Sequence, residues 1–229
     1  MGLKLPPDRL YNRAIIAFNC VVLALWLYIE GLIVYYIYKN VYTGATFNLN
    51  AVSIYGLWSS VENAFKLATV VHSLNIFYVY FGTEYDKKCL YMTLFHHVKG
   101  YIMYFISFNL LKETLEPRWA LVNICIWTSL NILHCINAIN FKRQQRSEFL
   151  EWIYQKMFIT MFPLLTLSEL LIINRSAPFL KEMEKFREFP SRMPNPYNFQ
   201  IDLYIVYQCL PPALIVSSIV VYLNRIKFT

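Results

Sequence analysis

Long apolar runs alternate with short polar connections along most of the 229-residue chain. A helix that crosses the hydrocarbon core of a bilayer, about 30 Å thick, needs about 20 mostly apolar residues. Several runs reach or approach that length, so the pattern predicts an all-α, polytopic transmembrane bundle of about six helices in a single domain over residues 1–229. The expected spans cover residues 14–38, 52–71, 97–111, 119–139, 152–173 and 203–223.

The segment between the second and third spans is aromatic but interrupted by charge. Two acidic and two basic residues fall between positions 84 and 88, and ionised side chains are costly in hydrocarbon. We therefore interpret residues 73–95 as an extended connection. This interpretation leaves a third span over 97–111 that is short unless it tilts or begins earlier.

Composition agrees with a membrane protein, because 57% of the residues are hydrophobic and only 15% are charged. The net charge of +7 could indicate nucleic acid, yet lysine and arginine are scattered among short connections and form no dense block. We expect the lipid bilayer as a partner and no nucleic acid. An even number of spans puts both termini on one side, and the distribution of basic residues favours the cytoplasm for that side.

The spacing of cysteine and histidine does not favour a metal site. The five cysteines lie far apart without a CxxC pattern. Membrane diiron enzymes would need repeated HxxxH or HxxHH patterns, whereas this chain has four histidines, His72, His96, His97 and His134, of which only two are adjacent. We expect no metal and no cofactor.

Charged residues inside apolar runs are the candidates for function. Glu169 lies in the fifth expected span, where an ionised group costs roughly 2.5 to 3.5 kcal/mol on insertion scales. The alternative is a carboxylate that reaches water near the helix end, since Arg175 follows within about two turns. Glu62 and Lys66 are four residues apart and predict an ion pair on one helical face, with a direct substrate role as the alternative.

Several motifs resemble the very-long-chain 3-hydroxyacyl-CoA dehydratase family of the endoplasmic reticulum, also called protein tyrosine phosphatase-like A. The similar segments are Leu10-Tyr11-Asn12, Val61-Glu62, Val70-Val71-His72-Ser73, Phe162-Pro163 through Ser168-Glu169-Leu170, and Leu210-Pro211-Pro212. Glu169 falls on the family's catalytic Glu, whereas Phe162 stands where the family has its catalytic Tyr. His72 and His134 stand where the family has Arg.

The resemblance implies a hydro-lyase that dehydrates very-long-chain 3-hydroxyacyl-CoA to trans-2-enoyl-CoA in the third step of fatty acid elongation. It also implies the endoplasmic reticulum membrane as location, with elongase and reductase enzymes as possible partners. Dehydration needs a base and a proton donor, and residues seven apart lie nearly two helical turns apart on one face. Because Phe162 lacks the hydroxyl, Tyr101 or Tyr104 of the third span is a candidate for the donor.

Two other functions fit the same sequence. The first is a catalytically impaired homologue that acts as a membrane scaffold for elongation enzymes. The second is a small six-span transporter in which Glu30, Glu62 and Glu169 line a polar pathway.

Overall fold

The computed structural model of the protein describes residues 9–41, 53–77, 87–108, 117–142, 147–182 and 203–226. Its elements are α1 (Arg9–Val41), α2 (Ile54–Ser73), α4 (Lys87–Tyr101), the π-helix η2 (Ile102–Ser107), α6 (Pro117–Lys142), α7 (Glu148–Glu182) and α9 (Leu203–Ile226). No strand occurs among these described residues. The predicted all-α membrane bundle is confirmed.

Three of the described helices are long and apolar enough to cross a membrane. They contain the segments Asn12–Val41 of α1, Arg118–Asn140 of α6 and Glu148–Pro178 of α7, and α9 adds the shorter apolar segment Gln208–Val220. The count of six spans and the single domain over the whole chain stay predictions.

The third predicted span begins at a different residue from the one we expected. Helix α4 starts at Lys87, so the extended connection predicted for residues 73–95 is wrong from position 87 onward, and residues 73 and 75–77 are helical as well. The charges that argued against a span include Lys87 and Lys88, which are the first two residues of the helix and need not enter its middle. Residues 78–86 and 109–111 lie outside the described part of the chain.

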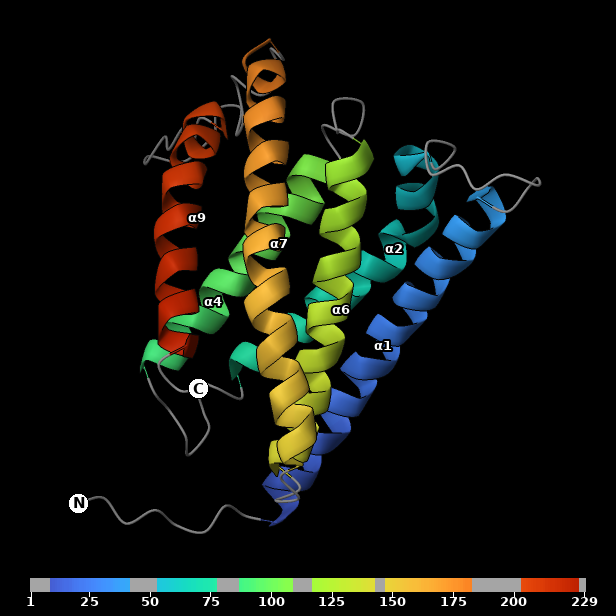
Figure 1. Ribbon diagram of the computed structural model, residues 1–229, viewed down its shortest axis with the longest axis vertical. Coiled ribbons are helices and arrows are strands. Elements are labelled where there is room, and N and C mark those ends of the chain that lie inside the picture. Colours follow the sequence, from blue (N-terminus) through green and yellow to red (C-terminus); the bar gives the residue numbers. More distant parts are fainter. Residues whose placement is uncertain are drawn as a thin grey trace, which may run out of the picture.

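Long helices stand side by side and a shorter one crosses them. Helix α6 packs between α1 and α7, and α9 packs on α7. Helix α4 runs obliquely across α6 and α7 in Figure 1, and it contacts α2. The first residues of α1, the junction of α6 with α7 and the end of α9 lie at the same end of the bundle (Figure 1).

Aromatic rings fill the interior where α1, α2, η2 and α6 meet. The ring centroids of Phe65 and Tyr104 are 4.4 Å apart, those of Trp26 and Phe65 are 5.2 Å apart, and those of Tyr104 and Trp127 are 5.2 Å apart. Trp26, Phe65 and Tyr104 have at most 1% of their surface exposed. Offset or edge-on contacts between such rings stabilise a fold beyond the burial of their area. The cluster fixes η2, and the helix that leads into it, against α6.

Two carboxylates of the apolar helices, Glu62 and Glu30, have partners within the bundle. The Nζ atom of Lys66 lies 2.6 Å from Oε1 of Glu62, which confirms the ion pair predicted from their spacing. Thr128 of α6 donates a hydrogen bond to Glu30 of α1. Each of these two carboxylates therefore accepts a hydrogen bond.

Candidate active site

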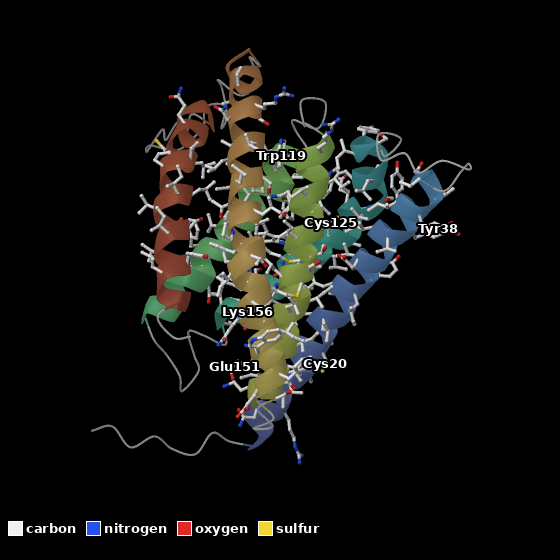
Figure 2. The ribbon with its side chains drawn as sticks, viewed as in Figure 1. Cys20, Tyr38, Trp119, Cys125, Glu151 and Lys156 are labelled. Atoms are coloured by element: carbon white, nitrogen blue, oxygen red, sulfur yellow. The ribbon has the colours of Figure 1, made fainter. Side chains whose placement is uncertain are left out.

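Glu169 is fully buried inside the bundle. Two charged residues near the start of α7, Glu151 and Lys156, are exposed (Figure 2), whereas the side chain of Glu169 further along the same helix has 0% exposure. The alternative that its carboxylate reaches water is therefore wrong. Neither Glu169 oxygen has a hydrogen-bond partner in the described part of the molecule. Buried polar atoms in proteins are nearly always satisfied, so this carboxylate is a candidate for a functional group.

The compensating charge comes from α4. The Nζ atom of Lys99 lies 3.0 Å from Oε1 of Glu169, and the Lys99 side chain is 3% exposed. This distance is that of an ion pair, and neither carboxylate oxygen accepts a hydrogen bond from the described residues. An isolated buried charge costs several kcal/mol. The Lys99 ammonium explains how the bundle can hold an ionised Glu169.

Two aromatic rings flank the same ammonium group. The Nζ atom of Lys99 lies 5.4 Å from the ring centroid of Trp127 and 5.6 Å from that of Phe162. Both distances are within the range of cation–π attraction, about 6 Å. Phe162 and Glu169 therefore both face Lys99, as their seven-residue spacing on α7 predicts.

A glycine in α4 leaves room for the Trp127 ring of α6 at this point. A Cβ atom added to Gly100 would lie 2.9 Å from Cζ2 of Trp127, closer than real Cβ contacts allow. The neighbouring residue in α4 is Lys99. The absence of a side chain at Gly100 thus helps to bring the Lys99 ammonium beside Trp127 and α7.

A chain of hydrogen bonds joins three helices beside the carboxylate. The Tyr104 hydroxyl donates to Oδ1 of Asn123 at 2.7 Å, and Nδ2 of Asn123 donates to Oγ of Ser168 at 3.0 Å. Ser168 precedes Glu169 in α7, and the Tyr104 hydroxyl lies within electrostatic range of that carboxylate. The Tyr101 hydroxyl instead forms a hydrogen bond with Ser73 at 3.0 Å. Of the two tyrosines predicted as donors, Tyr104 belongs to this network, and neither is hydrogen-bonded to Glu169.

The four histidines of the chain gather between α2, α4 and α6. The ring centroid of His72 is 5.2 Å from that of His97 and 5.9 Å from that of His134, and His96 and His97 are 5.5 Å apart. Their spacing in the sequence did not indicate this gathering, because the rings come from different helices. Even so, within the described ranges no three His, Cys, Asp or Glu side chains are arranged to hold a metal ion.

Lys99 was not singled out from the sequence. It lies within the predicted third span, so the cost of an ionised group in hydrocarbon applied to it as much as to Glu169. A basic residue in one apolar run and an acidic residue in another are the signal that could have predicted the pair.

The fold and this buried pair define a membrane-embedded helical protein with a candidate proton-transfer site. The family model described as "Protein tyrosine phosphatase-like protein, PTPLA" matches residues 67–227, and the chain therefore belongs to this family, the very-long-chain 3-hydroxyacyl-CoA dehydratases. The matched range contains Lys99, Phe162 and Glu169. Comparison with curated proteins and with solved structures finds no match. At the level of the family, the protein is dehydratase-like and related to fatty acid elongation.

Proposed function

We propose that the protein dehydrates a very-long-chain 3-hydroxyacyl-CoA to trans-2-enoyl-CoA, the third step of fatty acid elongation. The observation that carries this proposal is the buried Glu169 carboxylate, whose oxygens accept no hydrogen bond from the described residues. It stands at the position that resembles the family's catalytic Glu. A carboxylate with free lone pairs inside a closed bundle is suited to accept a proton from a substrate.

The reaction assigns a definite role to this carboxylate. Dehydration removes a proton from the carbon beside the thioester carbonyl and expels the hydroxyl group from the next carbon. Glu169 acts as the base, because the Lys99 ammonium at 3.0 Å stabilises the ionised form that can accept a proton. Phe162 supplies no proton, and its ring forms one wall of the site next to Lys99.

The surroundings of the reaction belong to the same proposal. A very long acyl chain is itself apolar, so a substrate of this class is compatible with a site inside a membrane bundle. We place the protein in the endoplasmic reticulum membrane with cytoplasmic termini. Elongase and reductase enzymes, which supply the substrate and consume the product, are the expected partners.

A second candidate is a homologue that binds elongation enzymes without catalysis. The absence of a hydroxyl group at Phe162 and the pairing of Glu169 with Lys99 favour it. This function predicts co-purification with elongase or reductase enzymes that survives Glu169→Gln, together with no turnover. The transporter alternative predicts neither association nor turnover, and the separate partners of Glu30 and Glu62 give it no support.

The test is turnover by the purified full-length protein in lipid nanodiscs. Long-chain 3-hydroxyacyl-CoA is supplied and enoyl-CoA is quantified by chromatography and mass spectrometry. We expect product from the wild type and a loss of about 10² or more in rate for Glu169→Gln. Glu62→Gln is the matched control, because it alters another paired carboxylate, whose partner is Lys66 and not Lys99, and it keeps near wild-type turnover. No product from the wild type overturns the proposal.

A further inference from the structure

We infer that Lys99 is the proton donor of this site and takes the place of the phenol that Phe162 lacks. This inference rests on the proposed dehydration reaction and adds a second catalytic residue to it. The ammonium group lies 3.0 Å from the Glu169 carboxylate and 5.6 Å from the centroid of the Phe162 ring. An acid and a base therefore occur together on the face of α7 where the family has its Tyr and Glu.

The Lys99 ammonium can contact the Glu169 carboxylate and the substrate hydroxyl group at the same time. A lysine carries three N–H donors, and its ion-pair contact with Oε1 of Glu169 takes up at most one of them. The flanking rings of Trp127 and Phe162 attract the cation but accept no proton from it. The remaining N–H groups can reach a hydroxyl group that is bound beside Glu169.

Other hydroxyl groups near the site are already engaged. The Tyr104 hydroxyl donates a hydrogen bond to Asn123, and the Tyr101 hydroxyl is hydrogen-bonded to Ser73. Thr166, which shares the face of α7 with Glu169, is hydrogen-bonded to the Phe162 carbonyl and to Ser218 of α9, and an alcohol is a weak acid. Lys99 is the group that the bundle places in direct contact with the base.

The proton balance closes within the pair. The Glu169 carboxylate takes the proton from the carbon beside the carbonyl, and the electrons of that C–H bond form the new double bond. The bond from the next carbon to its hydroxyl oxygen breaks, and that oxygen takes a proton from the Lys99 ammonium and leaves as water. Glu169 is then a carboxylic acid and Lys99 a neutral amine. Transfer of one proton across their 3.0 Å contact restores the starting ion pair without another reactant.

Substitutions at position 99 separate proton donation from charge. Lys99→Met removes the proton and the charge, and we expect turnover to fall by about 10² or more. Lys99→Arg keeps a cation beside Glu169, but a guanidinium group does not lose its proton in proteins, so turnover stays low. Phe162→Tyr in the Lys99→Met background returns a phenol to the site, and it raises turnover at least about tenfold above Lys99→Met alone.

The same assays show which proposal fails. Thermal unfolding first establishes that each variant is folded, and Lys99→Arg, which keeps the ion pair, is the variant expected to fold most like the wild type. If Lys99→Arg works as fast as the wild type, or Lys99→Met keeps turnover within about threefold while Glu169→Gln loses it, Lys99 is not the donor and the proposed function stands. Failure of Phe162→Tyr to rescue folded Lys99→Met also overturns the inference. A wild type without turnover overturns both.

Discussion

The Nζ atom of Lys99 and the Oε1 atom of Glu169 lie 3.0 Å apart, and neither side chain is more than 3% exposed. The residues come from different helices, α4 and α7. A buried ion pair adds little net stability compared with apolar residues of the same shape, but removal of one partner leaves an uncompensated charge. The pair therefore affects both the stability of the fold and the proposed reaction. The free energy of unfolding and the turnover rate measure these two effects separately.

Lys99→Met lowers the free energy of unfolding by about 3–5 kcal/mol, because the Glu169 carboxylate loses its only ion-pair partner among the described residues. The double variant Lys99→Met/Glu169→Met recovers most of this loss. Denaturant unfolding of the purified protein measures both. Lys66→Met is the control, since its pair with Glu62 is 28% and 27% exposed and contributes about 0–1 kcal/mol. Equal losses for the single and double variants at the Lys99 site would contradict the account.

Gly100→Ala pushes α4 away from α6, because its Cβ would lie 2.9 Å from Cζ2 of Trp127. Overpacking of this kind costs about 1–3 kcal/mol, and the displaced Lys99 also lowers turnover. Thermal unfolding and the dehydration assay measure the two effects. Gly31→Ala is the matched control, since an added Cβ there meets nothing within 4 Å. The substitution also replaces a helix-destabilising glycine. A Gly100→Ala variant as stable and active as Gly31→Ala would show that the close approach is unimportant.

Tyr104→Phe tests whether the hydrogen-bonded network acts in structure or in proton transfer. The change leaves Oδ1 of buried Asn123 without the Tyr104 donor and lowers the free energy of unfolding by about 1–3 kcal/mol. Turnover per folded molecule stays within about threefold of the wild type, because Lys99 and not Tyr104 supplies the proton. A fall of about 10² with intact folding would instead identify Tyr104 as the donor.

The sequence was most informative where a feature depends on neighbouring residues. The apolar runs predicted helices at α1, α6 and α7, since length and hydropathy are local properties. The Glu62–Lys66 pair was predicted because four residues make one helical turn. The start of α4 was predicted wrongly, because the charges at positions 84–88 were taken to exclude a helix through this segment, whereas Lys87 and Lys88 are its first two residues.

Contacts between helices could not be read in the same way. Lys99 of α4 and Glu169 of α7 are far apart in the sequence, with η2 and α6 between their helices, and no local spacing indicates that they meet. The histidines were judged by spacing within the sequence, yet His72, His97 and His134 come together from three helices. Glu169 could be singled out from the sequence because an ionised group is costly inside an apolar helix. Its partner Lys99 could not, because the packing of α4 against α7 determines which charges meet.

The most direct test of the central claim measures enoyl-CoA formation from a 3-hydroxyacyl-CoA deuterated at the carbon beside the carbonyl. The account predicts that the wild-type protein forms product, that the deuterated substrate reacts more slowly than the unlabelled one, and that folded Glu169→Gln loses turnover by about 10² or more. Equal product formation by the wild type and folded Glu169→Gln would contradict the claim that Glu169 takes this proton, and no product from either would contradict the dehydration reaction itself.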